Sequence, residues 1–215
     1  MKKTIKNIFN LMGYKIEKLP NQNSVALNLD SKVALTLAAA ECYAKYSTAC
    51  PVFQPWLGYG DFAEVYSGVQ ENTLVSPDRC YFVWKFAQYA ARLEGDFIEC
   101  GVFRGGTALL LARTLYSSQS GKLWLLYSFE GLSDAFLEKG DHYRRGDFSD
   151  TSEEAVSQLL APFLDSVKLR KGWIPHSFIG LEDLRFSFTH VDVDLYDPAL
   201  ACCEFIIRDL SKEGL

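Results

Sequence analysis

The chain has 215 residues with a net charge of −5, and 48% of its residues are hydrophobic and 23% charged. This balance is ordinary for one soluble globular domain, with or without a short N-terminal extension. The negative charge argues against a nucleic-acid partner, because phosphate contacts need a surplus of clustered Lys and Arg. No run of about 18 apolar residues occurs, so we expect no segment that spans a membrane.

The first residues resemble a signal peptide only in part. Basic residues precede a short apolar run, but Asn10 and Gly13 interrupt it, so an amphipathic helix is the better interpretation. The six cysteines form no C-x-x-C pair, and the adjacent Cys202 and Cys203 suit ordinary disulfide geometry poorly. We therefore predict reduced cysteines and a cytoplasmic location.

Residues 1–75 differ from the rest and are predicted to form an N-terminal helical and loop extension. A helix is expected at about residues 32–45, where short apolar residues alternate without Gly or Pro. The Pro-, Gly- and aromatic-rich stretch at residues 50–60 could form a lid over a site. A loop packed down by Phe53 and Trp56 is an equally good alternative.

From residue 76 onward, helices and strands alternate. Ser76-Pro77-Asp78 is typical of a helix start, and this helix should run to about residue 93. Strands are expected at 96–100, 123–127, 167–171 and 186–193, and helices at 107–116, 151–164 (capped by Thr151 or Ser152) and 198–210. Residues 129–148 should form a loop or short helix. This order predicts an α/β fold with a mostly parallel sheet and helices on both faces.

A glycine turn follows the first of these strands, in the run Glu99-Cys100-Gly101-Val102-Phe103-Arg104-Gly105-Gly106-Thr107. In a doubly wound sheet a nucleotide-like ligand binds there, because glycines let the backbone approach it and the next helix offers free N–H groups. The spacing G-x-x-x-G-G differs from the dinucleotide pattern, and no Walker pattern occurs. The Glu99 carboxylate would repel phosphate but suits a cation, which favours S-adenosylmethionine over NAD or ATP. A purely structural turn is the alternative.

Several runs resemble the macrocin O-methyltransferase family. They are Ser76-Pro77-Asp78-Arg79, Gly95-Asp96-Phe97-Ile98-Glu99-Cys100-Gly101-Val102-Phe103-Arg104-Gly105-Gly106, Ser128-Phe129-Glu130-Gly131-Leu132, Gly146-Asp147-Phe148-Ser149, Gly172-Trp173-Ile174-Pro175 and His190-Val191-Asp192-Val193-Asp194-Leu195-Tyr196. They occur in unbroken order over roughly residues 70–215. The resemblance implies a Rossmann-like class I methyltransferase core at 76–215 that methylates a hydroxyl of a sugar or polyol-like small molecule in natural-product biosynthesis.

Acidic residues end the last predicted strand. His190, Asp192 and Asp194 recur at every second residue and should point the same way on an extended chain. Two close carboxylates repel unless a cation joins them or one keeps its proton, and Mg²⁺ is a natural partner. The resemblance implies that Asp192 is a metal ligand and Asp194 the general base. His190 could orient either, or could be structural, and the two Asp residues could instead cap the loop.

The resemblance also implies cofactor contacts in the glycine turn and after the second and third strands. These candidate residues are Glu99, Gly101, Arg104, Gly105, Gly106, Thr107, Ser128 and Trp173, with Arg79 as a further candidate. Glu130 is a candidate as a substitute for the Asp that the family has after the second strand, with a solvated loop residue as the equal alternative. Trp173 could stack near the adenine or fill the core. The His-Tyr-Arg-Arg stretch at 142–145 could face an acidic substrate, but exposure to water is the preferred interpretation.

The sequence departs from the family pattern in two places. Tyr127 stands where the family has an Asp that accepts the ribose hydroxyls, and a phenol cannot give the two-point acceptance of a carboxylate. The sequence also ends before the expected fifth strand and its Asp-Asp pair, so we expect a truncated sheet with an edge that a homodimer could cover.

These observations leave two main hypotheses. The first is a metal-assisted O-methyltransferase that uses S-adenosylmethionine. The second is a truncated or degenerate relative that binds a ligand or partner without catalysis. A nucleotide-dependent oxidoreductase is disfavoured by the glycine spacing and by Glu99.

Overall fold

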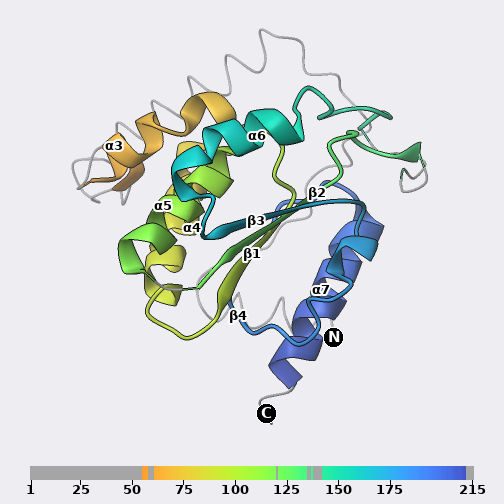
Figure 1. The fold of residues 1–215 in the computed structure, drawn as a ribbon. Coiled ribbons are helices and arrows are strands. Elements are labelled where there is room, and N and C mark those ends of the chain that lie inside the picture. Colours follow the sequence, from red (N-terminus) through yellow and green to blue (C-terminus); the bar gives the residue numbers. More distant parts are fainter. Residues whose placement is uncertain (1–54, 58–60, 120, 135–136, 138–141, 212–215) are drawn as a thin grey trace, which may run out of the picture. The chain divides into compact units, whose positions relative to one another are not determined.

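Four parallel strands form one sheet in the order β3-β2-β1-β4 in the computed structural model (Figure 1). The structure describes residues 55–57, 61–119, 121–134, 137 and 142–211. The chain divides into two compact units, Met1–Phe53 and Gln54–Leu215, and the described residues belong to the second. The predicted starter helix, the helix at 32–45, most of the 50–60 stretch and the approach to a fifth strand lie outside the described residues.

The strands lie where apolar runs predicted them. Their bounds are β1 Asp96–Cys100, β2 Leu123–Tyr127, β3 Val167–Lys171 and β4 Phe186–Val191. β1 lies between β2 and β4, and Glu99 is in register with Leu125 on one side and His190 on the other. The fourth strand was predicted to reach residue 193 but ends at Val191, although the Asp192 amide still donates to the Cys100 carbonyl at 2.8 Å.

Helices connect the strands. The α-helices are α3 Phe62–Ser67, α4 Pro77–Ala90, α5 Gly106–Ser118, α6 Glu153–Leu159 and α7 Tyr196–Ser211. The short 3₁₀ helices are η1 Pro55–Leu57, η2 Gln70–Asn72, η4 Ala161–Phe163 and η5 His176–Phe178. The single helix predicted at 151–164 is divided into α6 and η4, because Pro162 cannot donate a backbone hydrogen bond and disfavours α geometry in the preceding residue.

Two helix starts follow their sequence signals. Ser76 is the N-cap residue of α4, and Pro77 occupies its first turn, where a missing N–H costs nothing. The Ser152 hydroxyl accepts the Ala155 amide at 3.1 Å and caps α6. Thr151, the alternative cap, donates instead to the Phe103 carbonyl at 2.8 Å.

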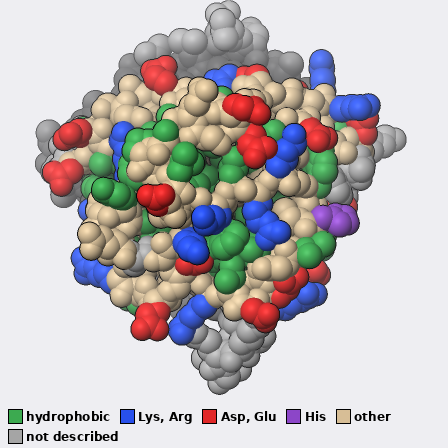
Figure 2. Space-filling model, viewed as in Figure 1, with side chains coloured by type: hydrophobic (Ala, Val, Ile, Leu, Met, Phe, Trp, Pro, Cys, Tyr) green, Lys and Arg blue, Asp and Glu red, His purple; other side chains and the backbone are tan. Residues whose placement is uncertain are grey.

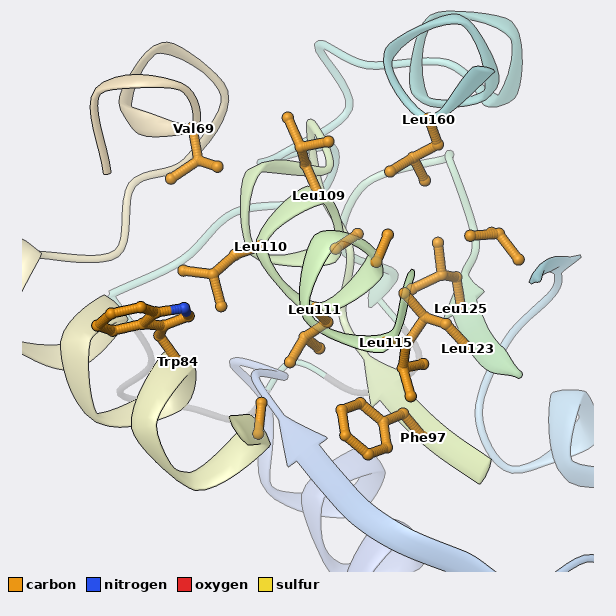
Figure 3. Packing of buried hydrophobic residues seen from close by; sticks show 14 of the residues in the cluster. Val69, Trp84, Phe97, Leu109, Leu110, Leu111, Leu115, Leu123, Leu125 and Leu160 are labelled. Carbon is orange, nitrogen blue, oxygen red and sulfur yellow. The ribbon is translucent and has the colours of Figure 1, made fainter. Parts of the chain in front are cut away.

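Hydrophobic cores cover both faces of the sheet. On one face α4, α5 and α6 pack on β1 and β2 through buried residues that include Trp84, Leu111 and Leu123 (Figure 3). On the other face α7 and η5 pack on the sheet (Figure 1), and the rings of Phe178 and Phe205 stack at 4.2 Å. The predicted α/β fold with helices on both faces is confirmed.

Residues before α4 share the first core. Phe62 of α3 and Val69 are fully buried among the residues of α4 and α5. The division of the chain at residue 75 and the role of the preceding segment as a lid stay predictions.

The surface carries charges of both signs. Basic and acidic side chains are interspersed on the face shown in Figure 2. Among the described helices, none is long and apolar enough to cross a membrane.

Candidate active site

Two open cavities lie beside the carboxyl ends of the strands. The first, here called the Trp173 cavity, holds about 560 Å³ of empty space including its mouth and is lined by residues that follow β1, β2, β3 and β4. The second, the Arg79 cavity, holds about 770 Å³ and is lined by residues of the α4 start, the glycine turn and the 142–148 loop. Ligands of open α/β sheets bind at this edge.

Four residues line both cavities and form a shared wall between them. They are Gly101, Tyr127, Asp192 and Asp194. Gly101 has φ +95°, and a Cβ atom there would collide with the Asp192 carbonyl. Only glycine lets the turn after β1 pass so close to the segment after β4.

The buried Glu99 and the partly buried His190 form a pair on neighbouring strands that lead into this wall. Glu99 has no exposed surface, and its Oε1 lies 2.8 Å from the His190 Nδ1. Burial alone would lower the pKa of His190, but the hydrogen bond and negative charge of Glu99 raise it. The second carboxylate oxygen of Glu99 has no hydrogen-bond partner among the described residues. Neither side chain lines either of the two cavities, and the two residues lie two positions before Gly101 and Asp192 of the wall.

The two aspartates of the shared wall have different surroundings. Asp192 Oδ1 lies 3.5 Å from a guanidinium nitrogen of Arg79, whose side chain is largely exposed. Partial burial raises the pKa of Asp194, the charge of Asp192 adds to this, and a hydrogen bond from the Tyr143 side chain opposes it. Asp194 is thus a stronger base than an ordinary aspartate.

Tyr127 ends β2 and takes part in a loop contact. Its hydroxyl donates to the Phe148 carbonyl at 2.8 Å. Burial, helped by the charges of Asp194 and Asp150, raises the pKa of Tyr127 to about 12. The phenol therefore stays protonated, and its one proton is used within the protein.

Comparison with known proteins identifies the family. The family profile described as macrocin-O-methyltransferase (TylF) matches residues 87–215, which is more than half of the chain. The chain belongs to the macrocin-O-methyltransferase family.

One curated relative comes from Streptomyces olivaceus and is named 8-demethyl-8-(2,3-dimethoxy-alpha-L-rhamnosyl)-tetracenomycin-C 4'-O-methyltransferase. It is 24% identical over an alignment of 133 positions, and the match covers 57% of this chain and 51% of the relative. The chain therefore spans about half the length of that relative.

Two solved structures share the fold of this macrocin-O-methyltransferase family member. The O-methyltransferase NovP superposes with a TM-score of 0.55 at 21% identity, over 64% of this chain and 62% of NovP. The calicheamicin methyltransferase CalS11 gives 0.51 at 13% identity, over 90% of this chain and 79% of CalS11. At these identities the likeness supports the methyltransferase fold.

Some of the residues predicted to contact the cofactor line one of the two cavities, and others do not. Ser128 and Trp173 line the Trp173 cavity, Thr107 lines the Arg79 cavity, and Gly101 lines both. The remaining candidates lie outside the linings of these two cavities: Glu99, Arg104, Gly105, Gly106 and Glu130. Their cofactor contacts stay predictions.

Local contacts of the described residues account for several of these positions. Arg104 forms an ion pair with Asp150. A Cβ atom on Gly106 would lie 2.7 Å from the Asn72 backbone, so this glycine is needed for packing. Glu130 is exposed, and its amide donates to the Ser128 hydroxyl at 3.2 Å.

Three aromatic residues of the Arg79 cavity were not predicted as site residues. Phe103, Tyr143 and Phe148 line it, and Phe103 and Phe148 have positive φ values of +49° and +64°. Positive φ is uncommon for residues with bulky side chains and cannot be read from residue type. Tyr143 belongs to the 142–145 stretch for which exposure to water was preferred, and these four residues are indeed exposed, although Tyr143 also lines the cavity.

The carboxylates fit a magnesium site in part. Asp192 and Asp194 are hard oxygen donors, and Mg²⁺ is commonly held by one or two carboxylates with water and substrate oxygens. Among the described residues, no group of three Asp, Glu, His or Cys side chains is arranged to hold a metal ion. The guanidinium of Arg79 also competes for Asp192.

Proposed function

We propose that this chain binds S-adenosylmethionine in the Trp173 cavity and transfers its methyl group to a hydroxyl of a sugar or polyol-like small molecule in the Arg79 cavity. One observation carries the proposal: in a member of the macrocin-O-methyltransferase family, Asp194, whose pKa is raised above that of an ordinary aspartate, stands in the wall common to both cavities. A base in that wall can reach a nucleophile that faces the cofactor.

The Trp173 cavity suits a cofactor with a flat base and a positive centre. Trp173 offers an aromatic face for a purine ring. Asp192 and Asp194 bring negative charge to the wall, which favours a sulfonium over a phosphate. Gly101 lies against Asp192 and has no side chain, so the cofactor would meet backbone atoms at the glycine turn.

Catalysis then requires alignment and one proton transfer. S-adenosylmethionine supplies a methyl group already activated by its sulfonium. The two cavities would hold the acceptor oxygen in line with that methyl group, which contributes most of the rate by orientation. The Asp194 carboxylate would take the hydroxyl proton, and its raised pKa makes it a stronger base than an ordinary aspartate.

Magnesium is a finer part of the proposal. Asp192 would supply a protein ligand, Asp194 would stay free as the base, and the ion would lower the pKa of a substrate hydroxyl. Asp192 would exchange Arg79 for the metal. Activity that is lost with EDTA and recovered with added Mg²⁺ would support this, and full activity in EDTA would exclude it.

The test begins with calorimetric titration by S-adenosylhomocysteine, with and without Mg²⁺. Micromolar affinity is expected, followed by transfer of a radiolabelled methyl group to glycosides with free hydroxyls. Asp194→Asn should bind S-adenosylhomocysteine with wild-type affinity and show no turnover, while the exposed variant Asp165→Asn serves as the matched control. No binding at millimolar ligand would overturn the proposal.

Tyr127 favours a second candidate, a family member that binds a ligand or partner without catalysis. Its hydroxyl is used by the Phe148 carbonyl, where the family pattern has a carboxylate for the ribose hydroxyls. Tight binding of S-adenosylhomocysteine without turnover on any acceptor would favour this candidate.

A cytoplasmic location and a homodimer complete the proposal. Cys80, Cys100, Cys202 and Cys203 are free, as expected in a reducing compartment. Light scattering of the purified chain would decide between a monomer and a homodimer.

A further inference from the structure

The segment that follows residue 142 is tied to Tyr127 of the shared wall and to the glycine turn. The Tyr127 hydroxyl donates to the Phe148 carbonyl, and the Thr151 hydroxyl donates to the Phe103 carbonyl, both at 2.8 Å. Asp150 pairs with Arg104 of the glycine turn. The segment therefore has a fixed place beside β1 and β2.

Aromatic packing holds the same segment from its inner side. The Phe148 ring contacts Phe103 edge-on, at 5.6 Å between centroids and 83° between planes. It also contacts the ring of Tyr143, at 5.8 Å and 59°. Phe103 and Phe148 both have positive φ, a conformation that persists in bulky residues only where surrounding contacts impose it. The contacts of Phe148 thus fix the direction of the Tyr143 ring.

The ring of Tyr143 lies on the same cavity as the proposed base, Asp194. Tyr143 and Asp194 both line the Arg79 cavity, with the Tyr143 side chain placed to donate a hydrogen bond to the carboxylate of Asp194. Asp194 is exposed and lies three residues beyond the end of β4, where no strand pairing restrains its backbone. A carboxylate accepts several hydrogen bonds at once, so a bond from Tyr143 leaves lone pairs for a substrate proton.

We propose that Tyr143 is a positioning residue for Asp194, and that Tyr127 supports it by holding Phe148. This inference rests on the proposed function. Tyr127 then has a role that the family's Asp does not have. In place of a contact to the cofactor, its hydroxyl makes a contact to Phe148 that orders the substrate side of the site. A general base must lie within hydrogen-bond reach of the proton it takes, and a small displacement costs a large part of its effect.

Kinetics of Tyr143→Phe test the positioning role. The variant keeps the ring and its contact with Phe148 but loses the hydroxyl. We expect kcat to fall about ten- to hundredfold, with the acceptor KM and the S-adenosylhomocysteine Kd within about twofold of wild type. Tyr89→Phe removes the same atom from an exposed residue of α4 and should leave all three values unchanged.

Hydrogen exchange of Tyr127→Phe tests the support without any need for turnover. Loss of the hydroxyl frees the Phe148 carbonyl, so amides of residues 143–149 should exchange faster than in wild type, while those of β1 stay protected. The same variant should also lower kcat, as Tyr143→Phe is expected to do.

The outcomes separate this inference from the proposed function. If Asp194→Asn abolishes turnover while Tyr143→Phe retains wild-type kcat, the positioning role is overturned and the proposed function stands. A fall in stability and in kcat together, with a raised KM, would assign Tyr143 a merely structural role and overturn the inference. Unchanged exchange in Tyr127→Phe would overturn the supporting role of Tyr127. A wild-type chain that neither binds S-adenosylhomocysteine nor turns over would end the proposed function and the positioning role with it.

Discussion

The Nδ1 atom of His190 lies 2.8 Å from Oε1 of Glu99, a carboxylate with no exposed surface. The two residues are register partners on β1 and β4, so the sheet itself brings them together. The sequence predicted Glu99 as a cofactor contact, whereas its observed partner is the histidine that leads into the two aspartates. This pair therefore links the two strands that lead directly into Gly101 and Asp192 of the shared wall.

Glu99→Gln should therefore destabilise the protein. The variant leaves a buried imidazole without its charged partner, and the free energy of unfolding should fall by about 1–3 kcal/mol in urea denaturation. Glu94→Gln, on an exposed residue just before β1, is the control and should change little. Unchanged stability with weaker S-adenosylhomocysteine binding would instead support the predicted cofactor contact of Glu99.

Gly101→Ala should disturb both the fold and the binding site. A Cβ atom there collides with the Asp192 carbonyl, and φ is +95°, so the free energy of unfolding should fall by about 1–3 kcal/mol or more. Gly180→Ala has the same sign of φ but no atom within 4 Å of the added Cβ, so it isolates the cost of the collision. Equal losses in the two variants would contradict the close approach.

Asp194→Asn should raise stability at neutral pH while it removes turnover. Burial raises the pKa of Asp194 above the usual 3.8, so the folded state holds this proton more tightly than the unfolded state. Stability then falls as pH rises from 3.8 through the folded pKa, and the penalty is complete at neutral pH. The Tm difference between Asp194→Asn and wild type should thus be small at pH 3 and positive at pH 7; a difference that is negative at pH 7 would contradict this. Asp165→Asn is the control.

Tyr127→Asp should restore the two-point acceptor of the family pattern. A carboxylate at the end of β2 can accept both ribose hydroxyls, and S-adenosylhomocysteine affinity should rise by about tenfold. The same change breaks the bond to Phe148, so kcat should not rise with affinity. Calorimetry measures the first effect, with Tyr127→Phe to separate the loss of the phenol from the gain of charge; weaker binding by Tyr127→Asp would show that the ring is needed.

The sequence predicts the fold well because local signals agree with tertiary structure. Apolar runs fix β1, β2 and β3 at their observed bounds, and Ser76 with Pro77 marks the start of α4. The error at β4 has a clear cause: the pattern of alternating residues continues to Val193, but β1 ends at Cys100 and offers no further partner. The break between α6 and η4 was readable from Pro162.

The site is predicted less completely because it depends on which residues meet across the sheet. Asp192 and Asp194 were found from their spacing, and Trp173 and Ser128 from the resemblance. The pairing of Glu99 with His190 depends on strand order and register, and the contacts of Tyr127 with Phe148 and of Tyr143 with Asp194 depend on a loop of irregular backbone. No periodic signal marks such contacts.

Because β1 and β4 are neighbours in the strand order β3-β2-β1-β4, the shared wall combines residues that are far apart in the sequence. Gly101 and Asp192, which meet in this wall, are more than 90 positions apart. No single hairpin or helix carries enough of the wall to bind a ligand when the sheet is unfolded. Binding is therefore linked to global unfolding, and a ligand at a hundred times its Kd should add about 2.7 kcal/mol to the unfolding free energy. Thermal denaturation of the unlabelled chain thus becomes a direct assay for cofactor and acceptor alike, and acceptors can be ranked by the melting temperature they confer before any methyl transfer is measured.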